Sequence, residues 1–366
     1  MLCVRGFRGL SSGESDGPWN HEICAGSSCS ARRQPSHTSK VDLLVMMPLG
    51  SPKKPKFKAF DFIDLFAGIG GMRLGFESAG GRCVFTSEWD KYAQETYYAN
   101  FGDRPDGDIT KVDETAIPEF DVLLAGFPCQ PFSSIGKREG FDHPTQGTLF
   151  YDVVRILRHH EPRSFLLENV AGLETHRGGE TLGVIEEALA DLGYEYDYKV
   201  LDAVRFGVPQ HRERIYIVGK FVGSSAGGRV SLPWPMGSDR IVPIGKSIQT
   251  GVTGYSVSKH LQDVYIFKKS DGRPQIVDQD SDFPVKTLCA SYHKIQRLTG
   301  TFVRDGETGL RLLTEAECKA IMGFPKKFKI PVSRTQMYRQ MGNSVAVPVI
   351  KVLAKWMIDE VGVLDA

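Results

Sequence analysis

The chain has 366 residues, of which 41% are hydrophobic and 24% are charged, a balance typical of a globular protein with one large core or two smaller ones. It has no run of about 20 apolar residues, so we expect no membrane span. The apolar core of a secretory signal does not follow Arg5 and Arg8. A formal net charge of +1 gives no support to nucleic-acid binding.

The seven cysteines are irregularly spaced, without a CxxC pair or a Cys/His set. Such spacing predicts reduced thiols in a cytoplasmic protein, and no metal site. The charge is unevenly distributed, because eleven Lys/Arg and four Asp/Glu lie between Lys286 and Arg339. A locally basic region can neutralise phosphates, but it is equally typical of a solvated surface.

Residues 1–57 are rich in Ser, Gly, Arg and Pro and show no sustained period, so we expect a mostly disordered N-terminal extension. Met46 and Met47 precede a short basic linker, residues 51–58, and either is a candidate for the natural start. The lysines of this linker are more typical of a solubilising segment than of an address signal.

Strand and helix patterns alternate from residue 59 to about residue 220. Apolar runs predict the strands, and apolar stripes with a helical period predict the helices between them. This alternation predicts an α/β fold with a mainly parallel sheet covered on both faces. The expected strands are 60–66, 83–86, 121–125, 164–168, 194–201 and 215–219, and the expected helices are 70–79, 90–100 with Asp90 as N-cap, 149–159 and 180–192.

The composition and periodicity of the sequence change near residue 221. Residues 221–305 lack a helical period and carry many Gly, Ser, Thr and Asp, which predicts a smaller, irregular, partly β domain. Thr314 then begins a capping-box pattern, Thr-Glu-Ala-Glu, that predicts the start of a helix. Residues 345–361 predict a final helix with Pro348 in its first turn.

Residues 125–133 place a cysteine, Cys129, between two prolines directly after a predicted strand. Ligands and reactive groups in open α/β sheets lie just past the carboxyl ends of strands. A lone free cysteine is more often a small buried hydrophobe, so the other motifs must decide between the two interpretations.

A glycine-rich segment, residues 66–71, follows the first strand and opens a helix, which lets the backbone approach a ligand closely. The segment is not the GxGxxG pattern, so it disfavours NAD. Glu88 ends the next strand, where it can bind ribose hydroxyls, and Trp89 offers an aromatic face to an adenine. Asp108 can accept a hydrogen bond from an exocyclic amine. Singly, each is also typical of a turn acid or a core aromatic.

The segment Phe-Pro-Cys-Gln-Pro-Phe-Ser, residues 127–133, resembles the nucleophile loop of the DNA (cytosine-5)-methyltransferases of bacterial restriction-modification systems. Further segments resemble that family's motifs in its order, and the match covers roughly residues 58–220 and 306–360. They are DLFAGIGG (64–71), EWD (88–90), GDIT (107–110), ENV (168–170), QHRER (210–214), RLLT (311–314) leading to GFP (323–325), and QMGNS (340–344).

The resemblance implies a Rossmann-like methyltransferase domain over residues 58–220 that uses S-adenosyl-L-methionine. It implies a target-recognition domain over 221–305 and a C-terminal segment, 306–366, that packs back on the catalytic domain. The cofactor-binding residues that it implies are Phe66, Ala67, Gly68, Gly70, Gly71, Glu88, Trp89, Asp108, Ile109, Pro128, Asn343 and Ser344.

The resemblance makes Cys129 the nucleophile, whose thiolate adds to cytosine C6 and turns C5 into a nucleophilic enamine carbon. Glu168 ends an apolar strand, where burial raises a carboxyl pKa, and its protonated form can hydrogen-bond the ring at N3. Gln210, Arg212 and Arg214 alternate and share one face of an extended segment. The resemblance assigns Arg214 to the base and Arg212 to organising Cys129 and Glu168. The alternative for this segment is a solvent-facing charged strand edge.

A target base inside a duplex must be flipped out before a protein can reach it. The polar, glycine-containing loop 132–143 is expected to close over the DNA, and residues 286–294 resemble the recognition-domain core of bacterial members. The expected DNA contacts are Gln130, Ser133, Ser134, Lys137, Gln210 and Thr287.

The sequence therefore predicts a methyltransferase that modifies C5 of cytosine in a short double-stranded DNA target. We expect a monomer in the bacterial cytoplasm, with a cognate restriction endonuclease as its functional partner by analogy. One alternative is an RNA cytosine-5 methyltransferase, against which the 85 residues available for reading DNA argue. The other is a catalytically silent DNA-binding regulator, against which the intact Cys129, Glu168 and Arg214 argue. The target sequence cannot be read from the chain.

Overall fold

The computed structural model describes residues 59–128, 149–223 and 227–362. Several predicted features lie outside the described residues. They are the extension 1–57, the loop 132–143, and the site residues Cys129, Gln130, Ser133, Ser134 and Lys137.

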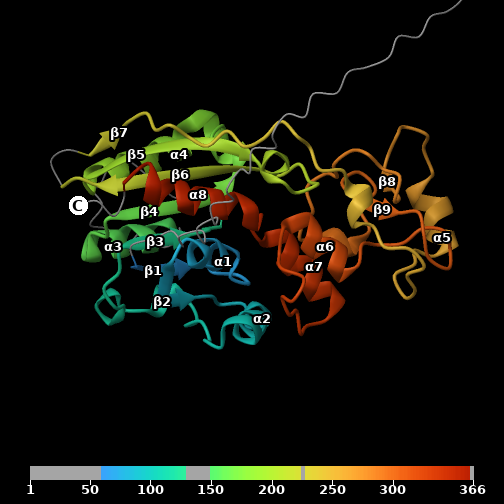
Figure 1. The fold of residues 1–366 in the computed structure, drawn as a ribbon, viewed down its shortest axis with the longest axis horizontal. Coiled ribbons are helices and arrows are strands. Elements are labelled where there is room, and N and C mark those ends of the chain that lie inside the picture. Colours follow the sequence, from blue (N-terminus) through green and yellow to red (C-terminus); the bar gives the residue numbers. More distant parts are fainter. Residues whose placement is uncertain (1–58, 129–148, 224–226, 363–366) are drawn as a thin grey trace, which may run out of the picture. The chain divides into compact units, whose positions relative to one another are not determined.

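Seven strands of the described chain form one sheet in the order β2-β1-β3-β4-β6-β5-β7 (Figure 1). Strands β1 to β4 run parallel to one another, whereas β6 is antiparallel to both of its neighbours, β4 and β5. The amino end of β6 therefore lies beside the carboxyl ends of β1 to β4. The strands are β1 (Phe60–Leu65), β2 (Gly81–Ser87), β3 (Val122–Ala125), β4 (Ser164–Val170), β5 (Tyr194–Asp202), β6 (Glu213–Phe221) and β7 (Gly228–Arg229).

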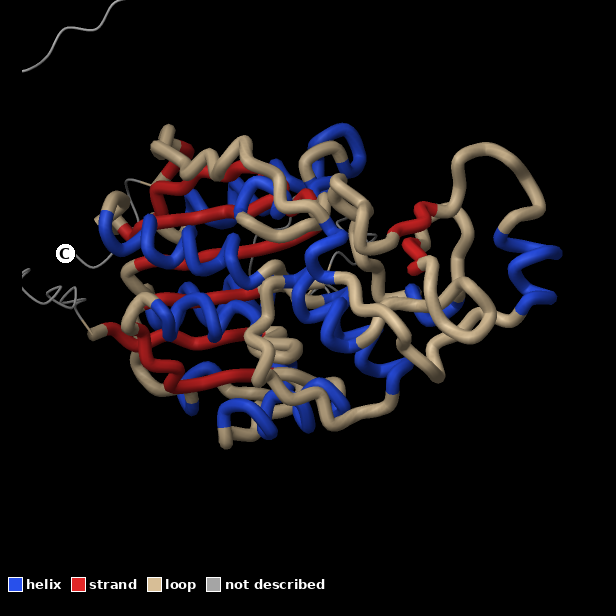
Figure 2. Tube along the Cα trace, turned by 45° about the vertical axis from the view of Figure 1, so that its right-hand side comes forward, coloured by secondary structure: helices blue, strands red, loops and turns tan. Residues whose placement is uncertain are grey.

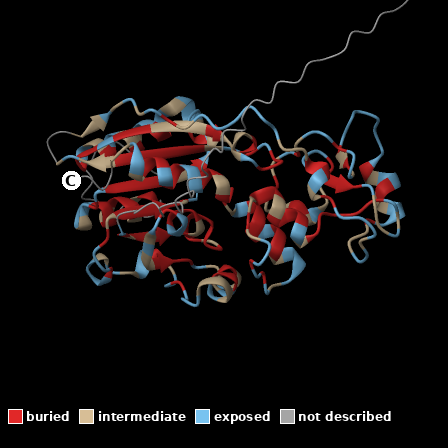
Figure 3. Cartoon of the chain, viewed as in Figure 1, coloured by how far each residue is buried: buried red, intermediate tan, exposed pale blue. Residues whose placement is uncertain are grey.

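Alternate residues of the central strands enter two different hydrophobic cores. Leu65 and Leu167 join the core that contains helices α3 (Phe150–His160) and α4 (Glu180–Asp191). Leu124 and Leu166 join the core that contains α1 (Gly71–Ser78) and α8 (Val347–Asp359). This period of two is expected of strands covered on both faces. Figure 2 shows the strands side by side in one layer, and Figure 3 shows that their residues are mostly buried.

The predicted alternation of strands and helices is confirmed, and the observed ends of the predicted elements lie within two residues of the expected ones. Asp90 is the N-cap of α2 (Lys91–Phe101), because its side chain accepts hydrogen bonds from the backbone of Tyr92 and Ala93. The elements without a predicted range include the short edge strand β7 and helix α7 (Arg334–Asn343). Helix α7 is strongly polar and buries few apolar side chains, so its sequence carries a weak helical period.

A third core joins the irregular region to the helices that follow it. Strands β8 (Gln275–Val277) and β9 (Thr301–Val303) form a parallel pair, and α5 (Lys259–Leu261) is a single turn. Val277 and Phe302 pack in the same cluster as Ile321 of α6 (Glu315–Met322) and Met337 of α7. Segment 306–366 thus contributes α6 and α7 to this third core, and α8 to the core that covers one face of the seven-stranded sheet.

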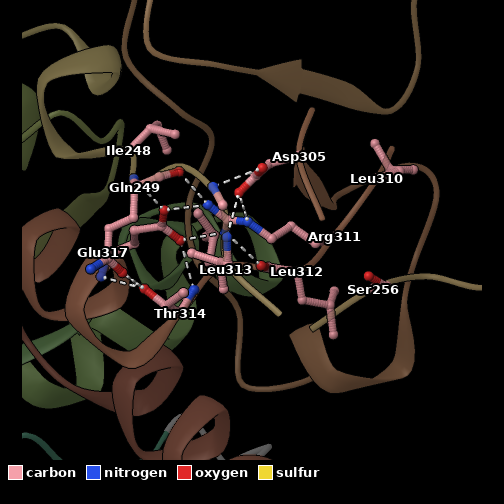
Figure 4. Close-up of polar contacts among 12 residues, drawn as sticks. Ile248, Gln249, Ser256, Asp305, Leu310, Arg311, Leu312, Leu313, Thr314 and Glu317 are labelled. Carbon is pink, nitrogen blue, oxygen red and sulfur yellow. Dashed lines mark hydrogen bonds and ion pairs between the residues drawn. The ribbon is translucent and has the colours of Figure 1, made fainter. Parts of the chain in front are cut away.

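Arg311 holds this third core together from inside (Figure 4). Its guanidinium makes two hydrogen bonds of 2.9 Å to the Glu317 carboxylate and one of 2.9 Å to Asp305. A further hydrogen bond of 2.7 Å goes to the backbone carbonyl of Gln249. Glu317 also completes the predicted capping box with Thr314, which is confirmed. A buried ion pair needs such a full set of partners to offset the loss of hydration.

One stretch of the described residues, Arg334–Asp359, meets the length and composition expected of a membrane span. In the structure it is two helices, α7 and α8, and most of it is buried in the protein. Core helices of globular proteins meet the same criteria, so this stretch is weak evidence for a span.

Helix α1 approaches α8 so closely that Gly75 should not tolerate a side chain. An added Cβ would lie 2.3 Å from Ile350 Cγ2 and 3.0 Å from its backbone carbon, so Gly75→Ala should destabilise the protein by about 1–3 kcal/mol. Gly183, within α4, faces open space, and Gly183→Ala should stabilise by about 0.5–1 kcal/mol. Urea unfolding of both variants checks this, and equal effects would contradict the close packing.

Candidate active site

The predicted site residues meet at one edge of the sheet. The glycine-rich segment follows β1, Glu88 follows β2, Phe127 follows β3, and Glu168 lies near the end of β4. The reversed strand β6 brings Arg214, near its amino end, to the same edge, where Arg214 pairs with Val170. An open α/β sheet binds its ligands at this edge.

Glu168 and Arg214 form an ion pair, with 3.0 Å between Arg214 Nε and Glu168 Oε1. Both side chains are largely buried, at 12% and 15% exposure. Burial raises the pKa of Glu168, and the positive charges of Arg214 and Arg212 oppose that rise in part. The site thus contains a carboxyl group that holds a proton more readily than a solvated one.

The start of the cysteine loop is fixed against Glu168. Asn169 donates a buried hydrogen bond of 3.0 Å from its amide nitrogen to the backbone carbonyl of Phe127. At Gly126, an added Cβ would lie 3.6 Å from Glu168 Oε2. The chain therefore leaves β3 beside the Glu168 carboxylate just before it reaches Cys129, which lies outside the described residues.

The predicted common face of the 210–214 segment is confirmed. Gln210 and Arg212 are buried and Arg214 is nearly so, whereas His211 and Glu213 point outward and are exposed. The alternative of a solvent-facing charged edge is therefore wrong for these inward residues.

Arg212 joins three parts of the chain that are far apart in sequence. It is 2% exposed, and its guanidinium donates hydrogen bonds to the backbone carbonyls of Leu288 (3.2 Å), Gly342 (2.9 Å) and Ser344 (2.5 Å). Burial, followed by the positive charge of the nearby Arg214, lowers the pKa of Arg212 to about 10. Its charge opposes the rise in the pKa of Glu168, and its hydrogen bonds hold the backbone at Leu288, Gly342 and Ser344. Its predicted role in organising Cys129 concerns a residue outside the described ones.

Gln210 does not occupy a DNA-binding surface, and the prediction of a DNA contact for it is corrected. The side chain is fully buried, and its Oε1 accepts a hydrogen bond of 2.6 Å from the backbone of Leu288. Its Nε2 donates to the carbonyl of Ile321 and to the sulfur of Met322. Both ends of the amide are thus used inside the protein. Thr287, by contrast, is partly exposed, and its hydroxyl donates to the carbonyl of His211.

The glycine-rich segment is tied to the end of β2. Glu88 accepts hydrogen bonds of 2.8 Å from the backbone N–H groups of Gly68 and Asp90, one on each carboxylate oxygen. Phe66 and Gly68 have φ values of 56° and 57°, in the left-handed region, and an added Cβ at Gly68 would face open space. Beside them, Trp89 is 71% exposed and presents a free indole face.

The segment that carries Asp108 and Ile109 runs next to Glu88. The backbone of Asp106 donates to the carbonyl of Thr86, and its carbonyl accepts from the N–H of Glu88. Asp108 accepts hydrogen bonds from the hydroxyl and backbone N–H of Thr110, and the hydroxyl bond, as the largest effect, lowers its pKa. Asp108 is therefore an ionised hydrogen-bond acceptor close to Glu88 in the fold.

The glycine-rich segment, near the start of the described chain, contacts residues 344 and 345, near its end. An added Cβ on Gly71 would lie 2.7 Å from a methyl group of Val345 and 2.9 Å from the hydroxyl of Ser344. This close approach explains the glycine and places Ser344 against the predicted cofactor segment. Asn343, next to it, is exposed, as is Pro128, three residues after the end of β3. Gly70 and Ala67, which the resemblance assigns to the cofactor, are buried in the same segment.

Comparison with known proteins decides the family. The family model described as C-5 cytosine-specific DNA methylase matches residues 60–359. The chain belongs to this family. The methylase is 61% identical over 294 residues to the Type II methyltransferase M.BsuFI of Bacillus subtilis, with 80% of this chain and 71% of that one covered. It is 58% identical over 296 residues to M.MspI of Moraxella sp, with 81% and 70% covered.

Solved structures agree with this assignment. A Spodoptera frugiperda DNMT2 mutant matches with a TM-score of 0.65 and 25% identity, and covers 82% of this chain and 99% of its own. The S. pombe Dnmt2 methyltransferase, at 20% identity and a TM-score of 0.66, shares the fold and covers 82% and 99%. The predicted family, Rossmann-like fold and DNA cytosine-5 methyltransferase activity of the restriction-modification type are confirmed. The RNA alternative is not favoured, and the family match supports an enzyme over a silent regulator.

Sequence reasoning missed two polar groups of this edge, the buried Asp64 and the partly exposed Arg155. Asp64, at 1% exposure, has a pKa well above its ordinary value because of burial, although the charge of Arg73 opposes this. Arg155 of α3 binds the carbonyl of Ile109. The spacing of Asp152 and Arg155 on one helix face signals an ion pair. The contact to Ile109, which comes earlier in the chain, leaves no local pattern.

Replacing Glu168 by Gln should change the pH dependence of stability. Because burial keeps the Glu168 pKa above its ordinary value of 4.5, the folded protein binds this proton more tightly than the unfolded chain does. Ionisation of Glu168 therefore costs stability as the pH rises through the folded pKa, and Gln has no such cost. Urea unfolding between about pH 5 and about pH 8 should show the wild-type free energy of unfolding falling relative to that of Glu168→Gln.

The exposed neighbour Glu213 provides the control, because Glu213→Gln removes a solvated carboxylate. Its pH dependence should match the wild type. A difference between wild type and Glu168→Gln that stays constant over this range would contradict the raised pKa.

Gln210→Ala should destabilise the protein by about 2–4 kcal/mol, because it leaves the backbone groups of Leu288 and Ile321 buried without this partner. His211→Ala is the matched control, since its exposed pair with Asp202 contributes about 1 kcal/mol or less. Chemical unfolding measures both effects. A Gln210→Ala variant of unchanged stability and reduced DNA affinity would restore the original DNA-contact prediction.

Proposed function

We propose that this methylase transfers the methyl group of S-adenosyl-L-methionine to C5 of a cytosine in a short duplex DNA target, with Cys129 as the nucleophile. The observation that supports this most is the convergence on Glu168. Its carboxylate pairs with Arg214, and the strand end that leads to Cys129 is fixed beside it through Phe127 and Gly126.

The residues at the ends of β1 and β2 fit an adenosine-containing cofactor. Gly68 leaves open space beside the backbone, Glu88 and Asp108 supply carboxylate acceptors, and Trp89 supplies an exposed aromatic face. Ser344 packs on Gly71 and closes this segment from the other end of the chain. When bound, S-adenosyl-L-methionine supplies an electrophilic methyl group on a sulfonium. The remaining implied contacts are Phe66, Ala67, Gly70, Ile109, Pro128 and Asn343.

The protein's own groups prepare the base for this transfer. The Cys129 thiolate adds to C6, and C5 gains electron density as the ring becomes an enamine. Glu168, whose pKa burial raises, can place a proton at N3 and stabilise the charge that develops on the ring. Arg214 contacts the base and orients Glu168, while Arg212 fixes the surrounding loops. Loss of the C5 proton and elimination of the thiolate then release the product.

The DNA contacts and the organisation of the chain complete the proposal. The base leaves the duplex before reaction, and Gln130, Ser133, Ser134 and Lys137 contact the DNA around it. Thr287 does so from the recognition region, residues 221–305, beside the catalytic region, 58–220. The enzyme acts as a monomer in the cytoplasm and protects a target that a cognate restriction endonuclease cleaves. High identity to two Type II methyltransferases supports this context.

Duplex DNA that contains 5-fluorocytosine tests the mechanism, because the fluorine blocks the final elimination. Incubation with S-adenosyl-L-methionine should give a denaturation-resistant protein–DNA adduct that is lost in Cys129→Ser and retained in the control Cys83→Ser. Glu168→Gln should lower turnover at least about 100-fold with little change in DNA affinity. Absence of an adduct, on DNA that contains most short sites, would overturn the covalent DNA mechanism. Methyl transfer to tRNA in place of duplex DNA would move the activity to RNA.

A further inference from the structure

We propose that Arg155 is a positioning residue for the cofactor. From helix α3 it holds the segment that carries Asp108 and Ile109 where these residues can contact the adenine. The inference rests on the proposed function, since it takes the segment beside Glu88 as the adenine side of the cofactor site.

The guanidinium of Arg155 has three partners from three parts of the chain. Nη2 donates to the backbone carbonyl of Ile109 at 2.6 Å, and Nη1 donates to Glu114 Oε2 at 2.6 Å. Nε donates to Asp152 Oδ1, three residues earlier on α3, at 3.0 Å. The two carboxylates orient the planar guanidinium, and this orientation aims Nη2 at the carbonyl of Ile109. The side chain is 26% exposed, so solvent screens it only in part.

The segment is held on its other side by backbone hydrogen bonds. Asp106 is paired with Thr86 and Glu88 at the end of β2, by bonds of 2.9 and 2.8 Å. Two residues later Asp108 caps a short helical turn, Ile109–Lys111, and the Ile109 side chain is buried in the core. Asp108 thus lies between an anchor on β2 and an anchor on α3. The Arg155 bond to the Ile109 carbonyl fixes the Ile109–Thr110 peptide, one residue after Asp108.

Arg155 differs in this respect from a surface ion pair, which contributes little to stability or function. Arg82, for example, pairs with Asp61 at the amino end of β1, and its side chain is 76% exposed. Arg155 instead connects a rigid helix to a main-chain carbonyl within the predicted cofactor site. Removing it should loosen the segment and leave the carboxylate of Asp108 present but poorly placed.

Calorimetric titration of the full chain with S-adenosyl-L-methionine tests the proposal. Arg155→Met should weaken cofactor binding about ten-fold, and Arg155→Lys, which keeps the charge, should recover part of the loss. DNA affinity, and turnover at saturating cofactor, should stay within about two-fold of wild type. Arg82→Met is the matched control and should bind the cofactor like the wild type.

A double-mutant cycle with Asp108→Asn separates positioning from general destabilisation. If Arg155 acts through Asp108, the ten-fold effect of Arg155→Met should shrink to about two-fold in the Asp108→Asn background. Additive effects, or unchanged cofactor affinity in Arg155→Met, would overturn the inference. If Arg155→Met does not fold, the same double-mutant cycle is made with Arg155→Lys or with Asp152→Asn, which removes a carboxylate that orients the guanidinium. Failure of the wild type to bind the cofactor would instead overturn the proposed function.

Discussion

The buried guanidinium of Arg212 is the interaction on which the arrangement of this edge depends. A buried cation is costly unless it is hydrogen-bonded, and the two terminal nitrogens of Arg212 donate to the carbonyls of Leu288, Gly342 and Ser344. Its Nε has no hydrogen-bond partner among the described residues. Those carbonyls belong to segments at least 76 residues away in the sequence, so they lie next to Arg212 only when the protein is folded. Close packing reinforces this constraint, because an added Cβ on Gly342 would lie 2.1 Å from the backbone nitrogen of Ala290.

The direction of β6 explains how one short segment serves both structure and chemistry. Because β6 is antiparallel to β4, its first residues lie beside the last residues of β4. Successive inward side chains then have different tasks. Gln210 donates to the backbone carbonyl of Ile321 in α6, and Arg212 donates to that of Gly342. Arg214 forms the ion pair with Glu168. A parallel strand in this place would begin at the opposite edge of the sheet and could not bring Arg214 to Glu168.

Local patterns predicted much of this fold and some of its site. Apolar runs predicted the strands of the catalytic region, and helical apolar patterns predicted its helices. Short polar motifs predicted the caps at Asp90 and Thr314. The direction of β6 was not predictable, because an alternating pattern reads alike in both directions. Gln210 was expected to contact DNA, but it is buried and accepts a hydrogen bond from the backbone of Leu288, 78 residues later, which no local pattern predicts. The motif resemblance identified Glu168 and Arg214, while the contact from Arg155 to Ile109 depends on tertiary structure alone.

Gln210 and Arg212 together form a clamp on the backbone of Leu288, and this clamp does not depend on the side chains around it. Gln210 accepts from the N–H of Leu288 and Arg212 donates to its carbonyl, so both hold the main chain and not a particular side chain. The neighbouring Thr287 and Lys286 face solvent at least in part. Substitutions at these outward positions leave the clamp intact. The outward side chains of the 285–289 segment can therefore change while its main chain keeps the same hydrogen bonds to the segment that leads into β6.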